Sequence, residues 1–250
     1  MPGGKTENKQ EAIMVTAIGK GGRIESTDAC AYRIIDLARQ QLDAELPELQ
    51  PAVFLLPAVN IKDAPGPKPR PATAPAILTD SRLLYYYPER TISAYREDRQ
   101  SVTRMMLHIL MHGLLGHFEK CAGRQATWYS AAADLEVTDF LLSYARRFLR
   151  LRGEPETGAL LRGQHGRTAE ETYAQLSEWN TDEDRVRSVA APLESDMHMS
   201  WLLNHLRCYP SIHCAADWEE AACAVALNLR DAGRDGLAER LEGAWGFAAD

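Results

Sequence analysis

The sequence predicts a mainly helical α+β domain with a small β-sheet or hairpin. First, apolar residues recur every three or four positions in several long segments, as on the buried face of a helix. Second, one short aromatic-rich stretch, LTDSRLLYYYPE at 78–89, has turn residues between two strand-like runs. Third, no internal repeat or convincing linker divides the 250 residues, of which 45% are hydrophobic. We therefore expect a flexible tail at 1–11 and one domain at 12–250.

The clearest helix is expected at 27–45. Ser26 or Thr27 is a suitable N-cap, and Pro47 ends the segment. At 167–179, Thr168 and Glu171 have the spacing of a capping box. The same apolar periodicity predicts further helices at 97–117, 127–151, 196–207, 216–230 and 232–245.

The other segments carry weaker or different signals. Residues 12–18 are either a short strand or the start of a helix. The chain is expected to be irregular over 47–76, where PGPKPRPATAP at 65–75 has too much proline for a helix or a central strand. A hairpin is predicted with its turn at Thr79, Asp80 and Ser81.

Charge and composition argue against several classes of protein. The net charge is −7, and no face-forming cluster of Lys and Arg is evident, so we expect no nucleic-acid partner. No run of about 18 apolar residues occurs, and none follows the polar start, so we expect neither a membrane span nor a signal peptide. Five cysteines without regular spacing fit a reducing compartment, which makes a cytoplasmic location the expectation.

The stretch HILMHGLLGH, residues 108–117, is the strongest candidate for chemistry. On a helix, His108 and His112 lie about 40° apart and one turn along, so both imidazoles can face one ion. The surrounding helix is apolar nearly all round, and a buried imidazole without a partner costs about 1–3 kcal/mol. A shared metal ion and separate hydrogen bonds in the core both meet this need, and the spacing leaves the two open.

A third ligand is expected from the second long helix. The stretch AADLEVTD offers Asp134, Glu136 and Asp139, and Asp134 is favoured because the neighbouring alanines allow the two helices to approach closely. Alternatively, Asp134 is a surface acid. His117 would lie roughly 180° from the first two histidines on an unbroken helix, so it can reach the ion only if the chain turns at Gly113 or Gly116.

Five stretches in order resemble a known family. They are PATAPAILTDSRLLYYYPE, LHILMHGLLGH, AAADLEV, GRTAEETYAQL and SDMHMSW, which together span about residues 70–201. They are similar to the metallopeptidase domain that often precedes a von Willebrand A-like domain in bacterial proteins. The resemblance implies a zincin-like helical domain with a small sheet or hairpin beside the metal-binding helix. It also implies a Zn²⁺ cofactor and a peptide or protein as substrate or partner.

Carried over residue by residue, the resemblance makes His108 and His112 zinc ligands and Asp134 the third. By the same resemblance, His117, Asp196 and His198 are supporting or substrate-facing groups. Two features depart from the family pattern: Ile109 stands where the glutamate of HExxH is found, and no von Willebrand A-like sequence follows. The family asparagine after AAADLEV is replaced by Thr138, which is a milder change.

The missing glutamate leaves three hypotheses. Because that glutamate moves protons to and from the metal-bound water, its loss typically costs about 10² to 10⁴-fold in rate. The protein is a metallopeptidase relative with another general base, a pseudo-peptidase that keeps zinc and binds a peptide or protein, or a metal-free fold with hydrogen-bonded histidines. Candidate bases under the first hypothesis are Glu119, Glu136, His117 and His198. The sequence sets no oligomeric state.

Overall fold

The computed structural model describes residues 26–64, 75–149, 162–163, 165–178 and 213–247. Over these residues the protein is mainly helical with one small sheet, which confirms the mainly α, α+β prediction. Segment 12–18, the helix expected at 196–207 and nearly all of the proline-rich loop lie outside the described residues, as do Asp196 and His198. No helix in the described part has the length and apolar character needed to cross a bilayer.

The first helix forms where its cap and apolar spacing predict it. Helix α1 spans Thr27–Glu45, and the Ser26 side chain accepts a hydrogen bond from the amide of Ala29 at 3.1 Å. Pro47 opens the 3-10 helix η1 (Pro47–Leu49), which leads into the short helix α2 (Gln50–Val53). The predicted apolar face of α1 is buried: Ala31, Ile34, Ile35, Ala38 and Leu42.

The predicted hairpin is present, but the sheet has a third strand. Strands β2 (Ile77–Thr79) and β3 (Leu84–Tyr86) pair antiparallel, and the Asp80 carboxylate accepts hydrogen bonds from two amides of the turn, at 3.0 and 2.9 Å. Strand β1 (Ala58–Asn60) pairs parallel with β3, so the strand order is β1-β3-β2. The expectation that the chain is irregular was therefore wrong over 47–64, which also contains η1 and α2, because elements of three or four residues are too short to show a periodic pattern.

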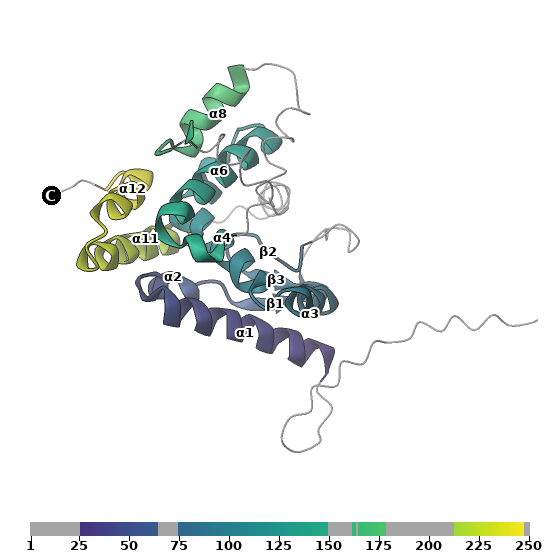
Figure 1. The fold of residues 1–250 in the computed structure, drawn as a ribbon. Helices are drawn as coiled ribbons and strands as arrows, with labels where there is room; N and C mark the ends of the chain where they lie inside the picture. Colours follow the sequence, from purple (N-terminus) through teal and green to yellow (C-terminus); the bar gives the residue numbers. More distant parts are fainter. Residues whose placement is uncertain (1–25, 65–74, 150–161, 164, 179–212, 248–250) are drawn as a thin grey trace, which may run out of the picture.

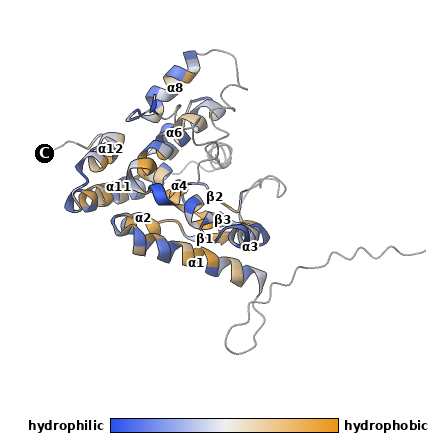
Figure 2. Cartoon of the chain, viewed as in Figure 1, coloured by the Kyte–Doolittle hydropathy of each residue, from blue (hydrophilic) through white to orange (hydrophobic). Residues whose placement is uncertain are grey.

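Helix α4 lies at the centre of the fold. It spans Ser101–Leu114 and contacts α1, α6 (Ala126–Tyr144), strand β2 and helix α11 (His213–Asp231) (Figure 1). Buried hydrophobic residues of these helices belong to one core cluster, and Figure 2 colours the hydrophobic residues orange along the ribbon. Such a position agrees with the expectation from its nearly uniform apolar surface.

Several helix ends differ from the prediction. Helix α3 (Pro88–Glu97), which begins with proline in its first turn, precedes α4 and was not predicted. Helix α4 ends before Gly116, whose φ of 70° is left-handed, and a four-residue helix, α5 (His117–Lys120), follows. Helix α6 stops at Tyr144 and is followed by the 3-10 helix η3 (Arg146–Phe148), so the helix expected to continue to 151 is shorter.

The later helices match the prediction closely. Helix α8 (Ala169–Glu178) begins with the expected capping box, in which Thr168 and Glu171 exchange hydrogen bonds at 3.0 and 3.3 Å. It packs on α6 at the end of the molecule opposite α1 (Figure 1). Helix α11 and helix α12 (Asp235–Trp245) pack against each other after a turn at Gly233.

Helices α4 and α11 approach closely at Gly113. A Cβ atom added there would lie 2.3 Å from a ring carbon of Trp218, which is far inside van der Waals contact. The indole has little freedom to move away, because Trp218 is 1% exposed and its Nε1–H donates to the carbonyl of Ser81 at 2.9 Å. This glycine therefore sets how closely α11 covers the central helix.

Replacing Gly113 by alanine should lower the free energy of unfolding by about 1–3 kcal/mol, because the added methyl group overpacks the contact with Trp218. Gly243→Ala is the matched control, since this glycine of α12 has no atom within 4 Å of an added Cβ. The control should raise stability by about 0.5–1 kcal/mol through helix propensity. Urea unfolding of both variants measures the difference, and a Gly113→Ala variant as stable as the parent would contradict the close approach.

Candidate metal centre

Three side chains converge between α4 and α6. His108 Nε2 lies 3.0 Å from Asp134 Oδ1, His112 Nε2 lies 3.1 Å from the same oxygen, and the two nitrogens are 3.0 Å apart. The three atoms thus form a nearly equilateral triangle. The structure brings together the two histidines and the acid favoured as the third ligand, and this group is of a kind that could hold a metal ion.

The dimensions of the triangle fit a small divalent ion. Ligand atoms about 2.0–2.1 Å from a tetrahedral zinc ion lie roughly 3.3 Å from one another. The observed edges of 3.0 to 3.1 Å need only a small expansion to reach that spacing. The ligand set therefore fits the ion in distance and in kind, with one position left for a fourth ligand.

Burial makes a positive partner for Asp134 important. Its side chain is 0% exposed, and its Oδ2 has no hydrogen-bond partner among the described residues. A buried carboxylate without compensation is expensive, and a cation held by the carboxylate and both imidazoles relieves that cost. The orphaned oxygen is thus a second feature, independent of the triangle, that suits a site able to hold a cation.

The sequence of each helix explains why the centre forms here. On α4 the two histidines are one turn apart and point to the same side, while most other residues of the helix are buried in the hydrophobic core. On α6, Ala131, Ala132 and Ala133 are almost completely buried immediately before Asp134, as small residues at a close helix contact would be. The side chain of His108 is 14% exposed, so the centre is nearest to solvent at this histidine.

The chain turns at Gly116, and this turn brings His117 back to the centre. The left-handed glycine ends α4, and His117 Nδ1 then lies 2.9 Å from His112 Nδ1. The sequence allowed His117 to approach the other two histidines only if the chain turned at Gly113 or Gly116, and it turns at Gly116. His117 nevertheless meets the far side of the His112 ring, away from Asp134, so it is not one of the three converging groups.

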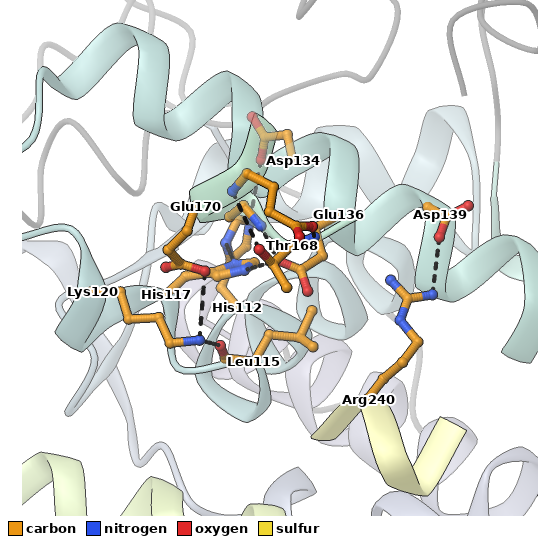
Figure 3. Close-up of polar contacts among 12 residues, drawn as sticks. His112, Leu115, His117, Lys120, Asp134, Glu136, Asp139, Thr168, Glu170 and Arg240 are labelled. Carbon is orange, nitrogen blue, oxygen red and sulfur yellow. Dashed lines mark hydrogen bonds and ion pairs between the residues drawn. The ribbon is translucent and has the colours of Figure 1, made fainter. Parts of the chain in front are cut away.

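Glu136 lies behind His117. Its Oε2 is 3.0 Å from His117 Nε2 and accepts a hydrogen bond from the amide of Ala169, at the start of α8, at 2.6 Å. Burial alone would raise the pKa of Glu136, but the hydrogen bond and charge of His117, together with the Ala169 amide, hold it below the ordinary value of 4.5. Glu136, His117 and His112 thus form a continuous buried chain, and Figure 3 shows their side chains gathered near Asp134.

The remaining candidates lie elsewhere. Asp139 joins α6 to α12, because it accepts a hydrogen bond from Arg240 at 2.9 Å. It also contacts His165 at 2.9 Å. Figure 3 shows Asp139 and Arg240 apart from His112 and His117. Glu119 is exposed on α5. Ile109, which stands in the place of the peptidase glutamate, is 0% exposed within the hydrophobic core.

Comparison of the chain with protein-family models, with curated proteins and with solved structures finds no match. The interpretation of the centre therefore rests on its geometry, and the resemblance to the metallopeptidase domain stays a prediction. Sequence reasoning did not foresee the contact between Glu136 and the amide of Ala169. The capping-box signal at Thr168 could have indicated it, because that signal places the first free amides of α8 at this position.

The centre also predicts a pH dependence of stability. Burial, followed by the nearby His108 and His117, holds the pKa of His112 well below the ordinary value of 6.5. In metal-free protein, folded His112 therefore stays neutral, whereas the unfolded chain takes up a proton as the pH falls below 6.5. This contribution to stability is fully present above pH 6.5 and is lost below it.

We expect the free energy of unfolding of the chelator-treated protein to fall by about 1.4 kcal/mol between pH 7.5 and 5.5 because of His112. Glu136 adds nothing over this range, since its lowered pKa affects stability only near and below its ordinary value of 4.5. Urea unfolding at the two pH values measures the loss. The His112→Asn variant, which has no such proton to gain, should lose about that much less, and equal losses in the two proteins would contradict the assignment.

Proposed function

We propose that this chain is a zinc-binding, metallopeptidase-like protein that acts on a peptide or protein, with an active site that lacks the usual helical glutamate. His108, His112 and Asp134 hold the metal in this proposal. The observation that carries it is the triangle of two imidazole nitrogens and one carboxylate oxygen, each 3.0 to 3.1 Å from the others and closed around a buried, otherwise unsatisfied acid.

The ligand chemistry favours zinc. Imidazole suits zinc, copper, iron and nickel, whereas magnesium and calcium prefer sites built from oxygen alone. Two histidines and one carboxylate with an open position are also the usual pattern of a catalytic zinc site. The contact of strand β2 with α4 supports a zincin-like arrangement, in which a strand runs beside the metal-binding helix.

Each residue of the centre has a defined task in this proposal. A bound zinc ion supplies a Lewis acid and lowers the pKa of a bound water to about 7. Asp134 supplies the negative charge that keeps the ion in the core. His108, as the partly exposed ligand, lies where a substrate would enter. The surrounding apolar side chains of α4 exclude other water from the buried ligands.

A second candidate function is a pseudo-peptidase that keeps zinc for structure and binds a peptide or protein. One observation favours it: the buried groups proposed as bases are already engaged. His117 and Glu136 contact each other at 3.0 Å and are held by His112 and the Ala169 amide, so neither is directed at the fourth metal position. Under the first function, His198 or the exposed Glu119 would have to act as the base.

We further propose a cytoplasmic location and no nucleic-acid partner. The net charge of −7 supports the second statement. The free cysteines of the described part, Cys30, Cys121 and Cys223, are consistent with a reducing compartment.

Metal analysis tests the shared basis of both functions. Protein purified without added metal should contain about one equivalent of zinc, and Asp134→Asn, which keeps the shape of the side chain but removes its charge, should lose most of it. Asp217→Asn, an exposed position on α11, is the charge-matched control and should bind as the parent does. A parent protein that binds no zinc even after zinc is added excludes both functions.

Peptide cleavage separates the two functions. If the protein is an enzyme, zinc-loaded protein should cleave members of a mixed peptide library slowly, about 10² to 10⁴-fold below a glutamate-assisted rate, and Asp134→Asn should abolish cleavage. Mass spectrometry of the digests provides the measurement. Absence of zinc-dependent cleavage by fully loaded protein would leave the binding function as the better account.

A further inference from the structure

We infer that Glu136 and His117 are positioning residues that act through His112: they keep a proton on His112 Nδ1, so that His112 Nε2 presents its lone pair to the metal. This inference rests on the proposed function, because it assigns a task to residues behind one of the proposed ligands. It also departs from the sequence-based hypothesis in which the same two residues are general bases.

The direction of each hydrogen bond can be followed along the chain, beginning at the amide of Ala169. The backbone N–H of Ala169 can only donate, so Glu136 Oε2 is an acceptor at 2.6 Å. That oxygen also lies 3.0 Å from His117 Nε2, and because it already accepts from the amide, His117 Nε2–H is the donor of this contact. With its one ring proton on Nε2, His117 has its lone pair on Nδ1, and this is the form that a metal-bound His112 with its proton on Nδ1 requires.

The same reasoning continues to the metal ligand. Because His117 Nδ1 is an acceptor, the contact of 2.9 Å to His112 requires that His112 Nδ1–H donates. Neutral His112 then carries its lone pair on Nε2, the atom that lies 3.1 Å from Asp134 Oδ1 and 3.0 Å from His108 Nε2. The chain of contacts thus selects the form of His112 that binds a cation.

Burial makes this selection effective. His112 and His117 are 0% exposed and Glu136 is 6% exposed, so bulk water is not available to exchange protons or to replace a missing partner. Without an acceptor at Nδ1, the proton of His112 is better placed on Nε2, where the Asp134 carboxylate accepts it. That form satisfies the acid with a proton and cannot bind the metal until the proton moves.

The anchor of this chain comes from a different part of the fold. Glu136 is held at the first residue of α8, a ten-residue helix whose positive end favours a carboxylate. Histidine ligands of metals commonly donate their second N–H to a carboxylate, directly or through another group. Here a second histidine is inserted between the ligand and the carboxylate.

Zinc affinity of His117 variants tests the inference. His117→Asn places an amide oxygen near the position of Nδ1 and can still accept from His112, whereas His117→Leu fills the space without an acceptor. Competition with a chromophoric chelator should show affinity 10 to 100-fold weaker for the leucine variant and within a few-fold of the parent for asparagine. His165→Leu, which removes an exposed histidine bonded to Asp139, is the control and should bind as the parent does.

Two further measurements separate positioning from packing. The visible absorption of the cobalt-substituted protein should change in the leucine variant and be retained in the asparagine variant, because the spectrum reports the ligands. Thermal unfolding of the metal-free proteins should show a higher melting temperature for the leucine variant than for the asparagine variant, since the site is buried and apolar side chains tolerate such a position better. Affinity and apoprotein stability should thus rank the two variants in opposite orders.

The outcomes distinguish the inference from the proposed function. If the parent binds no zinc, both fail. If the parent binds zinc and His117→Leu binds it equally well, or if asparagine weakens binding as much as leucine, the inference alone is overturned. Should the leucine variant fail to fold, Glu136→Ala against Glu136→Gln gives the same comparison, because only glutamine keeps an acceptor for His117 and the Ala169 amide.

Discussion

The structure depends on a carboxylate buried where two helices cross. Asp134 is completely enclosed, and among the described residues its carboxylate contacts the imidazoles of His108 and His112. A negative charge in such surroundings destabilises the fold unless positive charge reaches it. Three features allow the Asp134 carboxylate to contact both histidines: the packing of α4 on α6, the small alanines between the helices, and the direction of the two imidazoles. The proposed metal ion at this point would therefore also stabilise the fold of the domain.

Part of this centre could be predicted from the sequence because it follows from local rules. The spacing of His108 and His112 places them on one side of any helix, and the alanines before Asp134 indicate a close helix contact. The structure does bring these three residues together, and their role as metal ligands stays a prediction. The same local rules gave helix α1, the hairpin at Asp80 and the capping box of α8, all of which are confirmed.

What could not be predicted depends on tertiary contacts or on very short elements. The turn at Gly116 decides where His117 points, yet a glycine near the end of an apolar helix gives no sign of whether the helix continues through it. The engagement of Glu136 by α8 joins residues 33 positions apart, and no periodic pattern relates them. Strand β1 has three residues and is recognisable only by its pairing with β3. Ile109 looked like a vacant catalytic position in the sequence, whereas in the structure it is part of the core.

The ligand spacing also bears on the order in which the molecule assembles. The contacts of the centre span at most 26 residues, whereas the hydrogen bond that locks Trp218 over α4 joins residues 137 apart. Closing the longer loop costs about 1.5 kcal/mol more chain entropy, and local contacts favour fast folding. If the proposed cation binds the α4–α6 segment, it would hold the two helices together while α11 is still distant in space, so metal supply during synthesis would act on an early folding step.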